Sequence, residues 1–566
     1  MIYHIVLIAV VFFILAFRFY GSFLAKKFQV EDSSPTPACQ INDGIDYVPA
    51  KPALLLGQHF SAIAAAGPIV GPILACIWFG WVPALLWIVL GAVFIGGVHD
   101  FGSLFASLKH KAASIGEIVK DNMPRVYKLF LVFVWLALVY VIIAFTDITA
   151  HTFKTTVGGE AFGPAVAGSS ALYLLAAIAM GILLYRFKIR LWLATLIFLP
   201  LILFIIWAGP RLPQPILTSL SGISVKQWDA ILLVYCLAAS LFPVWLLLQP
   251  RGYLGGWFLY LVILIGLIGA VFGGFRIEYP AFNLSGLKSA DNAKSIFPVL
   301  FITVACGAVS GFHGIVSSGT TSKQVCKYKD SLPIGYGTML LEGLVAVLAI
   351  ATVIMLPKGS QILKSDPNLI YAQGLARYLG LLKINYGLAL AFALLAFSTF
   401  VYDTLDVCTR LARYIFQELT GWKSRQGGFI AALISLIIPF VFLMFTEEKG
   451  YLVAWPIFGT SNQLLASLIL LAISVWLIKS GKRPFYVILP MLFMMVMTIW
   501  SLFSLVVPFI SSLPAILQGE TSADILISGI CAVALLALSL TLIYEAAISL
   551  MGNGNSKGIK QGAKVS

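Results

Sequence analysis

Apolar segments of about 20 residues, each long enough to cross a lipid bilayer as a helix, follow one another along almost the whole chain. Of the 566 residues, 60% are apolar and only 11% are charged, too few polar residues to cover a water-soluble protein. The composition therefore excludes a soluble globular protein and a disordered chain, and predicts an all-α polytopic membrane protein. The fifteen expected spans lie roughly at 2–20, 54–80, 82–108, 128–150, 165–186, 190–209, 228–248, 253–275, 296–318, 332–356, 385–411, 428–446, 451–478, 485–512 and 523–551.

The Lys and Arg residues predict the orientation of these helices. With residue 1 outside, most of the 37 basic residues fall in inner segments such as 21–53 and 109–128, as the positive-inside rule requires. The net charge of +14 is therefore assigned to cytoplasmic loops. Since no dense run of Lys and Arg occurs, no nucleic-acid partner is expected. We expect the N-terminus outside and the C-terminus in the cytoplasm.

Ten central spans divide into two sets of five. Because five is odd, the second set runs opposite to the first, as in the inverted repeats of secondary transporters. The expected organisation is an N-terminal helix and cytoplasmic linker at 1–53, repeats at 54–209 and 228–411, four additional helices at 428–551 and a cytoplasmic tail at 552–566.

The first span of each repeat is expected to be interrupted near the bilayer midplane. Two Gly-Pro steps, Gly67-Pro68 and Gly71-Pro72, predict a break within 64–72 that lines a central cavity. A kinked helix packed closely at its glycines is an equally good interpretation of this motif. In the second set the corresponding signal is weaker, a single proline in Ala239-Ser240-Leu241-Phe242-Pro243.

These two places are the predicted substrate site. Where a helix restarts after a break, its free N–H groups and positive end can hold an anionic group without a buried cation. The residues expected to bind substrate are Gln58, His59, Ser61, Gly67 and Gly71 in the first repeat and Ser240 and Phe242 in the second.

Ionisable side chains inside the hydrocarbon are costly unless paired, and are therefore candidates for function. They are His59, His99, Asp100, Asp147, His313, Glu342, Asp403, Asp406 and Glu545. Asp147 and Glu545 lie toward span ends, where a structural role is expected.

Span 385–411 carries Thr399, Asp403, Asp406 and Arg410 on one helical face. Asp406 and Arg410 are spaced to pair directly, so a structural salt bridge is expected. Asp403 then has no obvious local partner and is a candidate to titrate or to bind a cation.

His313 lies between two glycines in span 296–318, with hydroxyl residues nearby. Glycines let helices approach closely, and hydroxyls can bind a cation. The alternative to a functional role is helix packing, with His313 a neutral hydrogen-bond donor.

Long motifs spread over most of the chain resemble the carbon starvation protein A family of transporters. They are DGIDYVP at 43–49, GQHFSAIAAAGPIVGP at 57–72, HDF at 99–101, LFPVWLLLQPRGYL at 241–254, FPVLFITVACGAVSGFHGIVSSGTTSK at 297–323, IGYGTMLLEG at 334–343, LDVCTRLAR at 405–413 and WPIFGTSNQLLA at 455–466. The resemblance implies a leucine-transporter-type fold and an inner-membrane importer of small nutrients, used under carbon limitation. Proton-coupled pyruvate uptake and peptide uptake are both attached to the family.

The resemblance also implies roles for the polar residues of span 296–318. In the implied fold this span contacts the broken first span where sodium often binds. His313 would suit proton coupling there, because a histidine titrates near neutral pH. The hydroxyls of Ser317, Ser318, Thr320 and Thr321 keep sodium as the alternative ion. Proton coupling is expected to run through His313 with Asp406 and Glu342 as its nearest helpers, and Glu342 by itself is assigned equally to proton handling or to structural pairing.

Four positions depart from the family pattern: Gln58, His99, Gly252 and Asp403. The pattern often has a second His at 58, a neutral Gln at 99, an Asp at 252 and a neutral hydroxyl residue at 403. These differences bear on the substrate more than on the fold.

Other function classes are less well supported. No histidine begins an HExxH motif and no GxSxG elbow occurs, so an intramembrane enzyme is not expected. The seven cysteines contain no CxxC pair, and neither a metal nor a cofactor is expected. A channel and a nutrient sensor remain the alternative classes. The sequence thus predicts a multi-pass importer of the bacterial inner membrane for a pyruvate-like carboxylate, or for a short peptide, coupled to H⁺ or to sodium.

Overall fold

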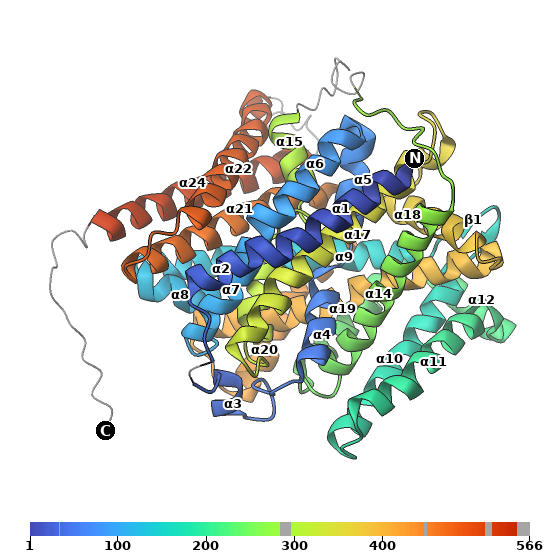
Figure 1. Cartoon of the computed structure of the whole chain (residues 1–566), viewed down its shortest axis with the longest axis horizontal. Helices are drawn as coiled ribbons and strands as arrows, with labels where there is room; N and C mark the ends of the chain where they lie inside the picture. Colours follow the sequence, from blue (N-terminus) through green and yellow to red (C-terminus); the bar gives the residue numbers. More distant parts are fainter. Residues whose placement is uncertain (33, 284–295, 447–449, 515–522, 552–566) are drawn as a thin grey trace.

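The computed structural model describes residues 1–32, 34–283, 296–446, 450–514 and 523–551, and helices make up most of it (Figure 1). The N-terminal half contains α1 Ile2–Ala16, η1 Phe17–Gly21, α2 Ser22–Phe28, α3 Pro37–Ile41, α4 Pro52–Ile63, α5 Gly67–Phe79, α6 Trp81–Gly91, η2 Ala92–Gly96, α7 Gly97–Lys109, α8 Ile115–Asn122, α9 Tyr127–Thr152, β1 Thr156–Val157, β2 Glu160–Ala161, α10 Gly163–Tyr185, α11 Leu191–Ala208, η3 Gly209–Arg211, α12 Gln214–Gly222, α13 Val225–Leu241 and α14 Leu248–Phe272. The C-terminal half contains α15 Ile296–Thr303, α16 Gly311–Val316, η4 Ser317–Thr321, η5 Tyr328–Asp330, η6 Leu332–Gly337, α17 Thr338–Ile354, η7 Gln361–Lys364, α18 Pro367–Gly380, α19 Tyr386–Thr420, α20 Arg425–Phe445, α21 Gly450–Lys479, α22 Phe485–Ser511 and α24 Ala523–Met551.

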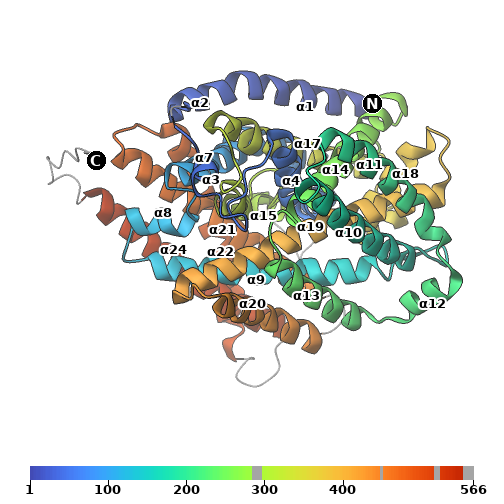
Figure 2. The same ribbon diagram turned by 90° about the horizontal axis from the view of Figure 1, so that it is seen from below.

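Helices α17, α19 and α21 are largely buried inside the protein, whereas α1 and α11 expose most of their side chains. Figure 2 shows α1 and α2 lying across one face and α20 on the opposite face. In Figure 1 the α10–α12 group lies at one edge of the molecule, and α22 and α24 lie at the opposite edge. The two short strands pair in an antiparallel hairpin, with Thr156 opposite Ala161. The polar residues of interest therefore lie within a bundle whose outer helices present apolar side chains.

Within the described residues, twelve helices are long and apolar enough to cross a membrane, and two bent pairs raise the number to as many as fourteen. The expected count of fifteen is not confirmed. One reason is the segment expected as a single span at 296–318, because α15 and α16 are both short and residues 304–310 between them are not helical. The chain is a multi-span membrane protein.

The predicted break in the first central span is present. Helix α4 ends at Ile63 and α5 begins at Gly67, with a bend of 43° between them. The break thus lies at 64–66, inside the predicted window. Close packing at the glycines is present as well, because an added Cβ at Gly67 would lie 2.5 Å from Cys306 and one at Gly71 would lie 2.5 Å from the Thr303 carbonyl oxygen. Both interpretations of the Gly-Pro motif therefore hold together.

The second break was expected near Pro243, and this expectation was wrong. Pro243 lies in the connection 242–247 that separates α13 from α14, two independent helices. The interruption in this half lies instead at 304–310, where Gly307 has a φ of +82° that favours glycine. No proline lies within this break. The backbone N–H and C=O groups that lose their helical partners here form hydrogen bonds with side chains of another helix.

That helix is α21, which supplies Asn462 and Gln463. The Asn462 side-chain amide donates to the Ala305 carbonyl at 2.7 Å, and its oxygen accepts the Phe312 N–H at 2.9 Å. The Gln463 amide donates to the carbonyls of Phe301, Val304 and Val309 at 3.0–3.2 Å. Buried backbone groups need such partners, so these two side chains maintain the opened segment.

Candidate functional site

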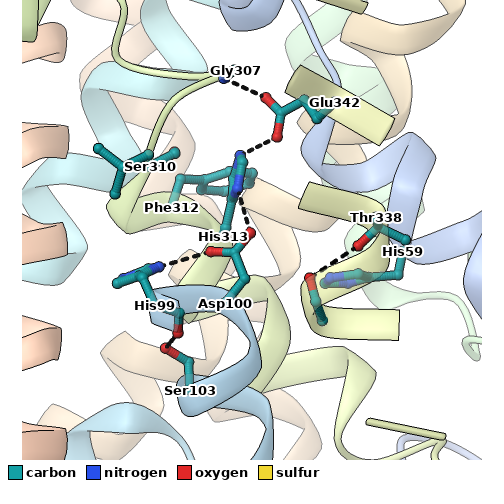
Figure 3. Close-up of polar contacts among 12 residues, drawn as sticks. His59, His99, Asp100, Ser103, Gly307, Ser310, Phe312, His313, Thr338 and Glu342 are labelled. Atoms are coloured by element: carbon teal, nitrogen blue, oxygen red, sulfur yellow. Dashed lines mark hydrogen bonds and ion pairs between the residues drawn. The ribbon is translucent and has the colours of Figure 1, made fainter. Parts of the chain in front are cut away.

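Four buried ionisable side chains from three helices meet beside the second break, and we call them the histidine cluster: His99, Asp100, His313 and Glu342 (Figure 3). Asp100 accepts from both histidines, with Oδ1 2.7 Å from His99 Nδ1 and Oδ2 2.9 Å from His313 Nδ1. The other nitrogen of His313, Nε2, lies 3.3 Å from Glu342 Oε2. All four side chains are fully excluded from solvent. A single imidazole thus bridges two carboxylates in a dry site.

Each member of the histidine cluster is positioned by a local feature of the chain. His313 lies on the one-and-a-half turns of α16, which begin directly after the break. Glu342 lies on α17, and its Oε1 accepts the N–H of Gly307 at 3.0 Å. The π-helical turn η2 precedes α7, which carries His99 and Asp100. The cluster is therefore bonded directly to the backbone of the interrupted segment.

The three residues expected to bind substrate before the first break do not point to one place. His59 contacts Thr321, with 2.8 Å between Nδ1 and Oγ1. Ser61 donates to Asp403 instead, and Gln58 packs against Gly252, where an added Cβ would lie 2.8 Å from it. Gln58 and Ser61, three residues apart, both face α14 at Gly252 and Gly255, whereas His59 faces η4, so this helix joins two polar regions rather than forming one binding surface.

The second polar region is the arginine cluster, which consists of Arg251, Asp403, Asp406, Tyr235 and Ser61. Arg251 Nε lies 3.0 Å from Asp403 Oδ1, and its terminal nitrogen donates to Asp406. Tyr235 donates to Asp406 at 2.8 Å. Arg251, Asp403 and Asp406 are each at most 3% exposed. Two carboxylates therefore share one guanidinium, which leaves one acid in excess.

These contacts correct two predictions. Asp406 pairs with Arg251 and not with Arg410, and Asp403 has a strong partner where none was expected. Arg410 instead donates to the carbonyls of Ala239 and Phe242, and its guanidinium lies 3.7 Å from Asp46. Spacing along one helix could not reveal an arginine contributed by another.

Ser240 and Phe242, expected to bind substrate at a mid-helix break, lie at and just beyond the end of α13. The Ser240 hydroxyl donates to the Leu237 carbonyl at 2.8 Å, within its own helix. The Phe242 side chain is 41% exposed. Since the break expected here is absent, neither residue has the backbone environment on which that assignment rested.

The four hydroxyls proposed as an alternative sodium site have different partners. Ser318 donates to the Gly314 carbonyl at 2.8 Å, and Thr320 donates to the Val316 carbonyl at 3.0 Å. Thr321 contacts His59, whereas the buried Ser317 oxygen has no hydrogen-bond partner among the described residues. Backbone carbonyls of the same segment thus satisfy two of the four hydroxyls.

Asp147 and Glu545, expected to be structural, have basic neighbours. Asp147 Oδ1 lies 3.5 Å from His151 Nε2, one helical turn away. Glu545 Oε2 lies 3.7 Å from Arg125. Both contacts agree with pairing near the ends of spans.

The histidine cluster also presents donor atoms of the kinds that bind metals. One ligand atom each from Cys306, His313 and Glu342 lie within 4.8 Å of one another, and all three residues are buried. Nitrogen, sulfur and carboxylate oxygen suit a zinc-like cation. Asp100 accepts from His313 Nδ1 and Gly307 donates to Glu342 Oε1, whereas His313 Nε2 and Glu342 Oε2, 3.3 Å apart, have no hydrogen-bond partner among the described residues.

Sequence reasoning missed Arg251, Asn462 and Gln463. Arg251 was assigned to a loop between two spans, although it lies in the first turn of α14 and is buried. Its position within the apolar run LLLQPRGYLGG was the available signal. Asn462 and Gln463 stand in the middle of a long apolar segment, where polar amides usually bond to a neighbouring helix.

Known proteins match the chain over most of its length. Residues 2–373 and 358–501 match the family described as carbon starvation protein CstA. A peptide transporter CstA of Campylobacter jejuni is 31% identical over 572 residues, covering 89% of this chain and 80% of that protein. The pyruvate/proton symporter BtsT of Escherichia coli is 28% identical over 599 residues, covering 88% and 81%.

Similar values hold for a third relative. The peptide transporter CstA of Bacillus subtilis is 32% identical over 522 residues, covering 84% of this chain and 85% of that protein. Among solved structures, a manganese transporter of Eremococcus coleocola is 12% identical with a TM-score of 0.48, covering 90% of this chain and 99% of that one. The family match and the 31–32% identities confirm the resemblance found in the motifs, and the chain belongs to the carbon starvation protein CstA family.

Proposed function

We propose that this protein is a secondary active importer that couples entry of a small carboxylate of the pyruvate type to entry of protons. A transport role follows from its family, whose named members are transporters. The relative named as a pyruvate/proton symporter supports this substrate and this ion. We place the protein in the bacterial inner membrane, with the N-terminus outside and the C-terminus in the cytoplasm, because that orientation puts most basic residues inside.

The observation that carries the proposal is the position of His313 between Asp100 and Glu342. One imidazolium balances the charge of only one of the two carboxylates. The number of protons held by this dry cluster therefore depends on any further charge brought near it. Proton-coupled uptake of a carboxylate needs a group that binds a proton more tightly when the anion is nearby.

The substrate carboxylate would bind at the start of α5. That helix begins at Gly67 beside the break. Pro68 has no N–H, and the N–H groups of Ile69 and Val70 donate to the Ala66 carbonyl, so within the described residues it is the Gly67 N–H that is open to an anion. An anion held there favours protonation of His313, and by reciprocity protonation tightens binding of the anion by the same factor. Deprotonation toward the more alkaline cytoplasm would then release both.

Alternating access is proposed to rest on an inverted repeat whose boundaries differ from those expected from the sequence. We propose that one repeat runs from α4 to α14 and the other from α15 to α21. Each starts with an interrupted helix, continues with a span containing a π-helical turn (η2 and η6), and then has a short helix (α8 and α18) before a long one (α9 and α19). The pairs α9–α19 and α13–α20 are in contact, and α14 packs on α4 as α21 packs on α16. Helices α10–α12 are then an insertion in the first repeat.

The test is uptake into proteoliposomes under an imposed pH gradient, acid outside. His313→Gln keeps a hydrogen-bonding side chain that cannot titrate, and should abolish concentrative uptake while exchange of labelled substrate continues. His110→Gln is the matched control, because His110 bonds to the Ala106 carbonyl outside the cluster and should change little. Accumulation by His313→Gln under the gradient, or wild-type uptake that follows a sodium gradient at fixed pH, would overturn the coupling assignment.

Peptide transport is the second candidate. Its support is the name of several relatives, together with the extra carboxylate of the arginine cluster, which could receive an ammonium group. Counterflow of labelled dipeptides against pyruvate separates the two substrates. Counterflow itself distinguishes a carrier from a channel or a sensor. If the peptide reading holds, Asp403→Asn should impair exchange of dipeptides and leave exchange of monocarboxylates unchanged.

A further inference from the structure

A cavity of about 770 Å³ lies among the loop at 46–47, the segment 112–127, η4 and the last turns of α19. Its wall includes Ile315 and Gly319, which belong to the same segment as His313 and Thr321. The loops that surround it are those placed in the cytoplasm by the distribution of basic residues. The cavity therefore lies where a substrate leaving the central clusters toward the cytoplasm would pass.

The three acidic side chains of this cavity are committed to partners within it. Glu117 accepts from Lys120 at 3.1 Å and from Tyr127 at 3.3 Å. Glu418 accepts from Ser114 at 2.7 Å and from Tyr127 at 3.0 Å.

The third acid, Asp46, accepts from the Tyr414 hydroxyl and lies 3.7 Å from Arg410. The negative charge of the cavity is therefore already balanced or hydrogen-bonded by neighbouring donors.

Lys323 has no such commitment. Among the described residues, no carboxylate oxygen lies within 4.0 Å of its ammonium group, and no hydrogen bond to another side chain is present. The ammonium is held between aromatic rings, 4.4 Å from the ring centre of Tyr414 and 5.4 Å from that of Tyr47. Burial lowers the pKa of Lys323, and the charges of Asp46, Asp43 and Glu418 partly offset this effect. A cation in such a position gains from an incoming anion.

The loop that carries Tyr47 is itself fixed. One oxygen of Asp43 accepts the N–H groups of Ile45, Asp46 and Tyr47, each at 2.9 Å. Tyr47 is thereby positioned over Lys323 without depending on a ligand. This arrangement holds the ammonium toward the cavity instead of leaving it to fold back on a carboxylate.

We infer that this cavity is a second carboxylate-binding site, in which the Lys323 ammonium receives the anionic group of a small monocarboxylate between the central clusters and the cytoplasm. The inference rests on the proposed function for the identity of the substrate. The inference adds a binding site on the cytoplasmic side, separate from the proposed central site. Lys323 lies two residues after Thr321, whose hydroxyl contacts His59, so the two sites are joined by one short segment.

The direct test is protection of Lys323 from an amine-acetylating reagent, measured by mass spectrometry on the purified full chain in detergent. Pyruvate at saturating concentration should slow acetylation of Lys323 at least fivefold, and the neutral analogue pyruvamide should not. Lys423 is the matched control, because it lines the same cavity but is exposed, and its acetylation should be unchanged. Equal protection by pyruvamide, or equal protection of Lys423, would overturn the site.

Transport kinetics supply the second measurement. Lys323→Gln should raise the KM for efflux, where substrate loads from the cytoplasmic side, about tenfold, as expected for loss of a hydrogen bond to a charged group. The KM for uptake should stay within twofold, and Lys323→Arg should restore efflux. An unchanged efflux KM in a folded Lys323→Gln protein would refute the inference. If pyruvate protects Lys323 but is not transported, the proposed function fails and the second site stands. If pyruvate is transported but does not protect Lys323, the proposed function stands and the second site fails.

Discussion

Glu342 connects His313 to the backbone of the interrupted segment. One of its carboxylate oxygens lies 3.3 Å from His313 Nε2, and the other accepts the Gly307 N–H at 3.0 Å. A change of charge on the imidazole therefore alters the interaction of Glu342 with the backbone of the loop at 304–310. This link gives a physical route by which protonation can alter the shape of the central site.

We predict that Glu342→Gln and Glu342→Leu differ in stability although both lose proton-coupled uptake. The Gln side chain still offers an oxygen to Gly307, so the unfolding temperature in detergent should change little. The Leu side chain leaves a buried N–H without a partner, at a cost of about 1–3 kcal/mol. Equal unfolding temperatures for the two variants would show that the Gly307 contact does not stabilise the loop.

The arginine cluster predicts a charge-dependent rescue. Arg251→Met leaves Asp403 and Asp406 buried without their cation, which should cost about 3–5 kcal/mol. Adding Asp406→Asn to this variant should recover part of the loss, because one buried charge is removed. Thermal unfolding of the purified proteins measures both effects. Arg211→Met is the control, since Arg211 is exposed and its guanidinium contacts Trp207, whose carbonyl accepts from it and whose ring lies 4.5 Å away. A similar loss there would argue against a specific role for Arg251.

The hydrogen bonds from Asn462 and Gln463 to the loop 304–310 predict a local change in hydrogen exchange. Asn462→Ala removes the bonds to Ala305 and Phe312, and should speed amide exchange across 304–312 by at least tenfold. Ser461→Ala is the matched control, because Ser461 is also buried but donates to Phe458 within its own helix. Unchanged exchange in Asn462→Ala would mean that the loop is held by other contacts.

The proposed orientation predicts the side from which Cys39 reacts. Cys39 is exposed in the segment 21–53, which we place in the cytoplasm. A membrane-impermeant thiol reagent should label it in inverted vesicles and not in intact cells. Cys39→Ser identifies the background from the six remaining cysteines. Efficient labelling in intact cells would reverse the topology.

The sequence predicted features whose cause is local. The Gly-Pro steps at 67–68 and 71–72 predicted a break within 64–72, and the structure has it at 64–66, because proline and glycine act on their own backbone. The break at 304–310 was missed, since it depends on donors from Asn462 and Gln463, more than 150 residues away in sequence.

The pairing of charges failed for a related reason. Helical spacing suggested that Asp406 and Arg410 would pair, but Arg251 from α14 lies closer in space. Sequence spacing ranks neighbours on one helix and carries no information on which face of another helix approaches. The histidine cluster likewise required the fold. Glu342 was expected to assist His313 and lies beside it, but Asp406, the other expected helper, pairs with Arg251, and the second carboxylate at His313 is Asp100.

The side-chain amides of α21 make the two interruptions mechanically unequal. Moving the loop 304–310 relative to α21 would break the bonds from Asn462 and Gln463, whereas among the described residues no side chain hydrogen-bonds to the backbone of 64–66. The second interruption is therefore expected to resist movement, because it is hydrogen-bonded to a largely buried helix. The first interruption is expected to bend more easily at its glycine-rich contact. We therefore expect α4 to move more readily than the α15–α16–α21 frame, and the His59–Thr321 and Ser61–Asp403 contacts are the bonds that such a movement would change.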